Sequence, residues 1–553
     1  MREQLTKLIQ EALVGIQEIF SGSRILDIPI TLSVPKNEGY GDYATNLAMT
    51  MAKALKQPPM KIAETLVRRL PDETTWLEKT EVVKPGFINF FLKDKAFQDI
   101  LPTIISQKES FGRARWGEGQ KVQIEFVSAN PTGPLHIGHG RGAALGGALA
   151  NLLKAIGHEV TTEYYLNDLG TQMEMLGRSI QARYKELQGE VVLFPENGYQ
   201  GDYIKDIAAE INREVSFRKI KESSLDLSYF SQYGRQAILK DIQKDLEAFG
   251  IRFDSWFSEE SLVRQGQVEA LIQKMKEKEL LYPEGGALWF KSRAFGDEKD
   301  RVVVRANGAL TYFASDMAYH LQKFKRGYHH LIDIWGADHH GYVPRLEAAL
   351  QSLGHDPNSL KIILVQLVTL IRDGKPVAMS TRAGEFVTLR EVLDEVGKDA
   401  ARYIFLTRRS DSPLDFDLDL AKKQTNENPV YYVQYAHARV CSVLAVAQSQ
   451  GFSLEDLDLN TIHRLSLPEE RRICKHLTEY PEEVSQAALK LEPHRIPFYL
   501  GELAAQFHYY YNHYRIISED QELSNSRLIL SKAIGKVIQN ALNLLGVSAP
   551  EKM

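Results

Sequence analysis

The sequence has very little cysteine. Only Cys441 and Cys474 are present, so a disulfide framework is excluded, and the two lack the spacing of zinc ligands. We expect both to be small buried residues in a protein of a reducing compartment. Glycine (38 residues) and proline (21 residues) stay near background, which excludes collagen-like and proline-rich scaffolds.

Long apolar runs are also missing. The most apolar stretch, residues 362–371, contains Gln366 and Thr369, so no segment reads as a transmembrane helix. The N-terminus starts with charged residues, and Leu5 and Leu8 follow at helical spacing. This pattern predicts an amphipathic helix rather than a signal peptide, and we expect a cytoplasmic protein with no membrane attachment.

Charge of one sign is not in excess. The 67 Lys and Arg residues are balanced by 72 Asp and Glu residues, which gives a net charge of −5. This balance excludes a strongly basic nucleic-acid-packing protein but allows a local basic surface. With 553 residues, 44% hydrophobic and 25% charged, the chain is long enough for several folded domains.

Three regions differ in pattern. The first has short alternating stretches around a helical pattern over residues 46–70, and the last is helical throughout. The middle region repeats strand, glycine turn and helix, which is typical of a parallel sheet. We predict an α/β fold: a Rossmann-type doubly wound parallel sheet domain with a helical insertion, an N-terminal α+β domain and a C-terminal all-α helical bundle. The predicted bounds are 1–112, 113–424 with the insertion at about 171–284, and 425–553.

The sheet strands are predicted from short apolar runs that alternate with helical stretches. A helix over residues 140–156 is expected after the first strand, and Gly157 is suited to end it. The predicted strands are Val122–Val127, Val160–Leu166, Val302–Val304, His330–Trp335 and Ile362–Thr369.

The most informative segment, residues 128–142, follows the first predicted strand. In open α/β sheets this edge binds the ligand, and helix N-terminal amides there face a phosphate. Gly138 and Gly140 allow a nucleotide close to the backbone, while His136 and His139 can face one way on the first helical turn. Two imidazoles could donate to phosphate oxygens as charge develops. A bare His-x-x-His pair would also fit a tight turn or a two-histidine metal pair.

The segment as a whole, Ser-Ala-Asn-Pro-Thr-Gly-Pro-Leu-His-Ile-Gly-His, resembles the signature of class I aminoacyl-tRNA synthetases. In this extended form it is similar to that of arginyl-tRNA synthetases. The resemblance implies that His136 and His139 are catalytic and that Gly138 and Gly140 contact ATP. It covers nearly the whole chain and is weakest in the helical insertion.

A second family element is expected near the end of the sheet domain. Residues 378–384 match the mobile Lys-Met-Ser-Lys-Ser loop at Met379 and Ser380, but Ala378 and Thr381 stand at the two lysine positions. This Met-Ser-Thr-Arg variant of the loop is similar to loop sequences of arginyl-tRNA synthetases. The resemblance implies catalytic roles for Met379, Ser380, Thr381 and Arg382, and Lys375 and Arg382 are the nearby cations that could replace the lysines. Without its partner motif, the segment would be an ordinary polar loop.

A third element, Gly-Ala-Asp-His at residues 336–339, follows another predicted strand. In the resembling family it lies against the ATP ribose, which implies ATP contacts for Gly336, Asp338 and His339. A structural turn or a metal site is the alternative. Adjacent histidines on one element point different ways, so His339 and His340 make a poor chelating pair.

The amino acid pocket needs a carboxylate, because a guanidinium presents a planar fork of donors. Tyr312 and Asp316 are four residues apart after a predicted Asn-Gly turn, so they share a face if a helix begins there. The family resemblance implies that they bind the arginine side chain. It also implies that Ser128, Asn130 and Gln366 surround the substrate's α-amino and carboxylate groups. Any one of these alone would be better explained by packing or a turn.

The two ends of the chain resemble the tRNA-contacting domains of arginyl enzymes. Asn37 and Tyr40 lie in a segment similar to the N-terminal domain that contacts the tRNA D-loop region. Tyr431, Tyr435 and Arg439 lie in a segment similar to the helical anticodon-binding domain, and their side chains could stack on and contact unpaired bases. Core packing is the alternative for the tyrosines.

The resemblance implies an ATP-dependent arginine–tRNA ligase that forms an arginyl-adenylate before transfer to tRNA. Its expected partners are L-arginine and arginine tRNA, with Mg²⁺ on the ATP triphosphate, no protein-bound metal, and tRNA needed before activation. We expect a monomer. Two alternatives remain: a small-molecule adenylyltransferase, which would not need the long flanking domains, and a catalytically silent RNA-binding paralogue, which the missing loop lysines make conceivable.

Overall fold

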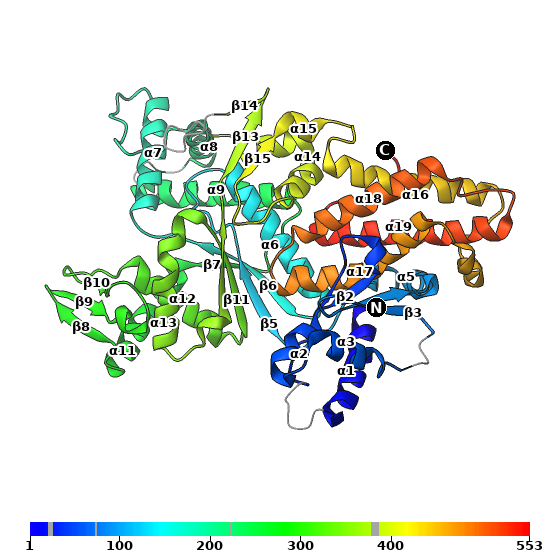
Figure 1. The fold of residues 1–553 in the computed structure, drawn as a ribbon. Helices are drawn as coiled ribbons and strands as arrows, with labels where there is room; N and C mark the ends of the chain where they lie inside the picture. The colour runs from blue at the N-terminus through cyan, green and yellow to red at the C-terminus, as the bar shows by residue number, and fades with distance from the viewer. Residues whose placement is uncertain (20–25, 72–74, 220, 222–223, 378–385) are drawn as a thin grey trace. The chain divides into compact units, whose positions relative to one another are not determined.

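The computed structural model describes residues 1–19, 26–71, 75–219, 221, 224–377 and 386–553 (Figure 1). The chain forms two compact units. Unit 1 comprises Met1–Phe111, Arg439–Tyr480 and Ala505–Val537, and unit 2 comprises Gly112–Ala438, Pro481–Ala504 and Ile538–Met553. Within the described residues, no helix combines the length and apolar character needed to span a membrane.

Unit 1 contains a small antiparallel sheet in the order β1-β2-β4-β3. The helical pattern over residues 46–70 forms two helices rather than one, because the chain turns at Lys56, whose φ is 51°, and at Pro58. The bounds are α1 (Arg2–Ile19), β1 (Leu32–Ser33), β2 (Tyr43–Thr45), α2 (Leu47–Leu55), α3 (Pro59–Val67), β3 (Leu77–Val83), β4 (Phe87–Leu92), α4 (Asp94–Gln98) and α5 (Ile100–Gln107).

Unit 2 is built on a five-stranded parallel sheet in the order β12-β11-β5-β6-β7. Figure 1 labels four of these strands, β11, β5, β6 and β7. The chain adds β6 and β7 on one side of β5 and then crosses to add β11 and β12 on the other. This reversal beside β5 makes the sheet doubly wound, as predicted. The strands are β5 (Lys121–Glu125), β6 (Glu159–Leu166), β7 (Ser255–Ser258), β11 (His330–Gly336) and β12 (Leu360–Val365).

Two predicted strands differ from the expectation: one lies in another sheet, and one is divided between two sheets. Val302–Val304 falls in β10, which belongs to a separate antiparallel sheet of order β10-β9-β8. The predicted strand Ile362–Thr369 is interrupted at Gln366, so β12 stays in the parallel sheet and β13 joins β14 and β15. The interruption has a physical cause: the buried guanidinium of Arg141 donates to the Gln366 carbonyl oxygen at 2.8 Å, and the Gln366 N–H donates to Ser410 O.

The charged stretch predicted as an insertion at about 171–284 is mainly helical, but it also contains β7, the edge strand of the parallel sheet. The remaining elements of the sheet domain are α6 (Ile137–Ala155), α7 (Thr171–Leu187), α8 (Asp202–Arg218), α9 (Leu227–Ala248), α10 (Glu259–Arg264), α11 (Gln267–Glu277), β8 (Leu281–Glu284), β9 (Ala287–Phe290), β10 (Arg301–Val304), α12 (Tyr312–Lys325), α13 (Val343–Ser352), β13 (Val368–Arg372), β14 (Lys375–Pro376), α14 (Leu389–Phe405), β15 (Leu414–Asp417) and α15 (Leu418–Lys422).

The C-terminal region is helical, as predicted, and each of its four long helices runs through both units. In unit 1, apolar residues of the last helix such as Ile529 and Ile534 are fully buried. That helix ends at Leu545, and Gly546 takes a positive φ of 69°, which favours glycine. The bounds are α16 (Pro429–Ser449), α17 (Pro468–Leu489), α18 (Arg495–His513) and α19 (Gln521–Leu545).

Helix α6 packs against β5, β6 and β11, and this packing depends on a glycine. A Cβ added at Gly146 would lie 2.2 Å from the Phe126 ring, so only glycine allows so close an approach of helix and sheet. The N-terminus of α6 is thereby held at the carboxyl end of β5, where the sheet order reverses.

Candidate active site

The carboxyl ends of β5 and β11 lie side by side, because the two strands pair in parallel from His330↔Val122 to Asp333↔Glu125. β5 leads into residues 126–136 and then α6, while β11 leads into the 3₁₀ turn Ala337–Tyr342. The two motifs at residues 128–142 and 336–339 therefore follow neighbouring strands, one on either side of the switch point. Ligands of open α/β sheets bind in such a crevice.

His136 and His139 form a reciprocal cap at the start of α6. The Gly138 N–H donates to His136 Nδ1 at 3.1 Å, and the His136 N–H donates to His139 Nδ1 at 3.2 Å. The two rings stack with centroids 3.7 Å apart. Gly138 fits under this arrangement because a Cβ there would lie 3.0 Å from His136 Cε1. A histidine pair thus replaces the usual hydroxyl or carboxylate cap.

The cap also fixes the protonation of the pair. Burial lowers the pKa of His136, and burial together with the neighbouring His136 lowers the pKa of His139 to about 3. Both rings are therefore neutral near pH 7. Since Nδ1 accepts a hydrogen bond in each ring, Nε2 carries the proton. The helix N-terminus presents two neutral N–H donors, which suits a phosphate that gains charge during a reaction.

The segment after the predicted mobile loop joins this turn directly. Leu389 N–H donates to Leu135 O at 2.7 Å, and Thr388 forms an antiparallel bridge with His136. The Phe386 ring meets the His136 ring edge-on at 6.2 Å. Lys375 lies exposed in β14, before the loop. The other predicted loop residues, Met379, Ser380, Thr381 and Arg382, lie outside the described residues.

A cavity of about 780 Å³ opens at the histidine pair. Of the predicted residues, Asn130, His136 and His139 are in its lining. Residues 196–201 and Tyr203 of the inserted helical stretch also line this cavity, as does Phe386. The insertion therefore contributes directly to the cavity that contains the catalytic candidates.

Tyr312 is the first residue of α12, and Asp316 lies one turn later on the same helix. Thr311 caps this helix by accepting from the Ala314 N–H. Asp316 accepts a short hydrogen bond from the Tyr342 hydroxyl, and burial raises its pKa although that bond opposes the shift. The Tyr312 ring is half exposed, and its hydroxyl lies against Gly170.

Glu259 is a site residue that the sequence analysis missed. Its side chain is only 4% exposed, and its Oε2 has no hydrogen-bond partner among the residues that the structure describes. Burial and the neighbouring Asp316 carboxylate raise its pKa to about 7. Burial raises the pKa of the neighbouring Tyr165 hydroxyl, and the Glu259 and Asp316 carboxylates add to that shift. A cationic donor group would satisfy these oxygens.

A buried ion cluster lies behind Asp316. Lys323 Nζ donates to Glu125 Oε2 at 2.7 Å and to Asp333 Oδ1 at 2.8 Å, and all three side chains are buried. His320 approaches Asp333 Oδ2 at 2.7 Å and the Asp316 carbonyl oxygen at 2.8 Å, so both ring nitrogens face acceptors. Burial alone would raise the pKa of Asp333, but Lys323 and His320 lower it to about 2.

The other predicted amino acid contacts are held by defined partners. Ser128 Oγ donates to Glu125 Oε1 at 3.0 Å and accepts from the Tyr165 N–H. Asn130 Nδ2 donates to Gln172 Oε1 at 2.8 Å, and Gln366 is held through its backbone. Val127 and Ser128 take positive φ values of 69° and 40°, which are strained for non-glycine residues.

The predicted ATP residues differ in surroundings. Gly336 ends β11, and a Cβ there would lie 2.4 Å from Asp338 Oδ1. The side chains of Asp338 and His339 are largely exposed, with 3.6 Å between His339 Nε2 and Asp338 Oδ2. At Gly140 a Cβ would lie 2.8 Å from Leu389, so packing against α14 already explains this glycine.

The residues predicted to contact tRNA belong to both units. In unit 1, Tyr40 is exposed, the Asn37 side chain accepts from the Gly39 N–H, and the Arg439 guanidinium lies over the Tyr511 ring. In unit 2, the rings of Tyr431 and Tyr435 stack with centroids 5.8 Å apart. Within the described residues, no group of three or more His, Cys, Asp or Glu side chains is placed to hold a metal ion.

Three domain families match the chain. Residues 100–421 match the catalytic domain of class I tRNA synthetases (R), residues 3–92 match the arginyl tRNA synthetase N terminal domain, and residues 433–553 match the DALR anticodon binding domain. The chain belongs to the arginyl-tRNA synthetase family. It is a class I arginine–tRNA ligase, which uses ATP to join arginine to tRNA.

Individual relatives agree with this assignment. An arginine–tRNA ligase of Syntrophotalea carbinolica is 53% identical over 559 residues and covers 100% of both chains. A solved structure described as an arginyl-tRNA synthetase of Campylobacter jejuni is 37% identical, covers 84% of this chain and 100% of its own, and has a TM-score of 0.77. The Thermus thermophilus arginyl-tRNA synthetase covers 100% of both chains at 23% identity with a TM-score of 0.77, which supports the fold.

The cap geometry predicts that His136→Asn separates stability from catalysis. Asparagine keeps an acceptor for the helix cap but loses the Nε2–H donor, so the melting temperature should stay near wild type. Arginine-dependent ATP–pyrophosphate exchange should fall on the order of 10²–10³-fold, the scale of losing one oxyanion donor. His136→Ala should lose the same activity and also about 1 kcal/mol of stability. Near wild-type exchange in His136→Asn would contradict the donor role.

Proposed function

We propose that the cavity at His136 and His139 is where ATP and L-arginine react. The observation that carries the proposal is the neutral histidine pair at the α6 N-terminus, beside the switch point of the sheet. An arginine carboxylate oxygen attacks the α-phosphorus of ATP, a phosphoanhydride bond breaks, and pyrophosphate leaves. The 2′-hydroxyl of the terminal tRNA adenosine then attacks the activated carbonyl, and AMP leaves. Neither step needs a protein nucleophile, so catalysis is positioning and charge stabilisation.

ATP is held around the histidine pair in this proposal. Gly138 and Gly140 border the phosphates at the helix N-terminus, while Gly336, Asp338 and His339 border the ribose at the end of β11. Support comes from the adjacency of β5 and β11. Lys375, with Arg382 and the neighbouring loop residues Met379, Ser380 and Thr381, supplies contacts to the outgoing phosphates. Mg²⁺ accompanies the ATP triphosphate and offsets part of its charge.

The guanidinium of arginine binds between Asp316 and Glu259, with Tyr312 beside it. Support comes from the unpartnered Glu259 oxygen and from the two raised carboxyl pKa values, because a cation would relieve both. Ser128, Asn130 and Gln366 surround the α-amino and carboxylate groups. Lysine would fit poorly, since its ammonium lacks the planar fork that addresses two carboxylates together.

The terminal domains hold the tRNA in this proposal, with bounds of 1–112 and 425–553 flanking the catalytic domain 113–424 and its insertion at about 171–284. Asn37 and Tyr40 contact the D-loop side, and Tyr431, Tyr435 and Arg439 contact the anticodon side. We further propose a monomer in the cytoplasm. The sequence has only two cysteines, which suits a reducing compartment.

The proposed reaction order predicts that ATP–pyrophosphate exchange requires both arginine and arginine tRNA. Exchange should be strong with tRNA and fall to background without it, whereas lysine in place of arginine should give none. Exchange that proceeds equally well without tRNA would support the ligase activity but contradict the proposed need for tRNA in the activation step. Binding of tRNA without any exchange would support a silent RNA-binding protein instead.

The raised pKa of Glu259 predicts a pH-dependent arginine KM. Its carboxyl group is mainly neutral at pH 6 and mainly charged at pH 8, because its pKa is about 7. A charged carboxylate binds the guanidinium more strongly, so the KM for arginine should fall as pH rises through 7 while the KM for ATP stays nearly constant. In Glu259→Gln the arginine KM should be high and flat across this range. A mutant that keeps the wild-type pH profile would contradict the assignment.

A further inference from the structure

The turn before the histidine pair has little support of its own. Residues 128–134 lie between β5 and α6, contain Pro131 and Pro134, and are joined by local backbone bonds such as Thr132 N–H to Asn130 O at 2.7 Å. Proline cannot donate from its backbone nitrogen, so such a turn depends on contacts from outside. Its geometry matters because it leads directly to His136.

Side chains from outside the turn provide that support. The Tyr164 hydroxyl donates to Ala129 O at 2.8 Å, Gln172 accepts from Asn130 Nδ2 at 2.8 Å, and the Tyr203 hydroxyl donates to Thr132 O at 2.8 Å. The Glu125 side chain holds Ser128 at the start of the turn. Gln172 is on α7 and Tyr203 is on α8, so part of this support comes from the inserted helical stretch.

Tyr203 is fitted closely to the turn. A Cβ added at Gly133 would lie 3.1 Å from the Tyr203 hydroxyl, so glycine at this position gives the hydroxyl room to reach Thr132 O. Burial raises the pKa of Tyr203, which keeps the hydroxyl protonated and able to donate. The loop before α8 is tied to α7, because the Tyr199 N–H donates to Ser179 Oγ at 2.9 Å.

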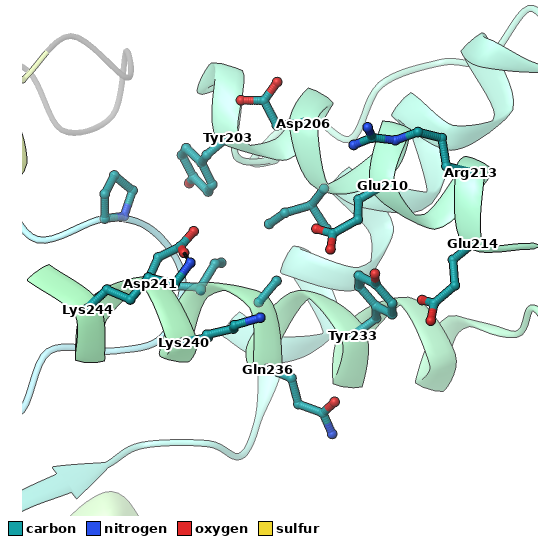
Figure 2. A pocket seen from close by; sticks show the side chains of 14 residues that line it. Tyr203, Asp206, Glu210, Arg213, Glu214, Tyr233, Gln236, Lys240, Asp241 and Lys244 are labelled. Carbon is teal, nitrogen blue, oxygen red and sulfur yellow. Dashed lines mark hydrogen bonds and ion pairs between the residues drawn. The ribbon is translucent and has the colours of Figure 1, made fainter.

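Tyr203 lines two cavities. One is the cavity at the histidine pair, and the other is a groove of about 430 Å³ that is lined mainly by residues of α8 and α9; Pro134 also lines both. Figure 2 shows the side chains of Tyr203 and of Tyr233 on α9 among those that line this groove. Tyr233 lines the groove and bonds Glu214 of α8, away from the turn. The two tyrosines therefore make matched contacts in the same insertion, but only Tyr203 reaches the turn.

We infer that Tyr203 is a positioning residue for adenylate formation: its hydroxyl fixes the Thr132 carbonyl and thereby the placement of His136 and His139. This inference rests on the proposed function. Loss of the hydroxyl leaves the carbonyl without its partner and lets the turn shift. Because hydrogen bonds to a developing charge are sensitive to small displacements, the effect falls on turnover more than on ground-state binding.

The test compares Tyr203→Phe with Tyr233→Phe in arginine-dependent ATP–pyrophosphate exchange with tRNA present. Each variant removes one hydroxyl from the insertion. Tyr203→Phe should lower kcat about 10-fold, with the KM values for ATP and arginine within about two-fold of wild type. Tyr233→Phe should leave kcat unchanged. Melting temperatures are measured in parallel, and kcat is measured well below them, so loss of folded protein does not contribute.

Two outcomes would overturn the inference: kcat of Tyr203→Phe within two-fold of wild type, or an equal loss in Tyr233→Phe, which would mean that the hydroxyls only stabilise the insertion. Absence of exchange in the wild-type enzyme would instead reject the proposed function, so the two failures are distinguishable.

A double-mutant cycle with Gly133→Ala tests the contact itself. The added methyl group should displace the Tyr203 hydroxyl and lower kcat in the wild-type background. Combined with Tyr203→Phe, the loss should be smaller than the product of the two single losses, because both changes break the same contact. Losses that multiply fully would show that the two sites act independently and would contradict the inference.

Discussion

Lys323 is completely buried, and its ammonium group joins the carboxylates of Glu125 on β5 and Asp333 on β11. These are the two strands on either side of the switch point. A buried charge is tolerated only when it is paired and hydrogen-bonded, and removal of one partner costs about 3–5 kcal/mol. The cluster therefore ties α12 to both strands in one arrangement, and the substrate site depends on that arrangement.

The cluster extends toward both ends of the amino acid site. Glu125 accepts from Ser128, which begins the turn to the histidine pair, and His320 donates to the Asp316 carbonyl oxygen on α12. Asp316, His320 and Lys323 recur at helical spacing, so one face of α12 carries Asp316, the proposed partner of the arginine side chain, together with His320 and Lys323. The proposed arginine contact and the packing of the sheet are consequently parts of the same hydrogen-bonded network.

Much of the candidate site was predictable from local sequence. The histidine pair, the start of α12 and the Gly-Ala-Asp-His turn each follow from a strand end and a helix start within a few residues. Glu259 was not predictable, because it follows a four-residue strand and gains its importance from Asp316, which is distant in sequence. The break at Gln366 was missed for the same reason: Arg141, more than two hundred residues earlier, holds its carbonyl.

The most direct test of this account is the arginine KM of Lys323→Met, measured beside Lys325→Met. The two lysines are on the same helix, but Lys323 is buried in the cluster and Lys325 is exposed. The account predicts that Lys323→Met raises the arginine KM at least about 10-fold, the equivalent of 1.4 kcal/mol, while Lys325→Met leaves it unchanged. A folded Lys323→Met enzyme with a wild-type arginine KM would contradict it.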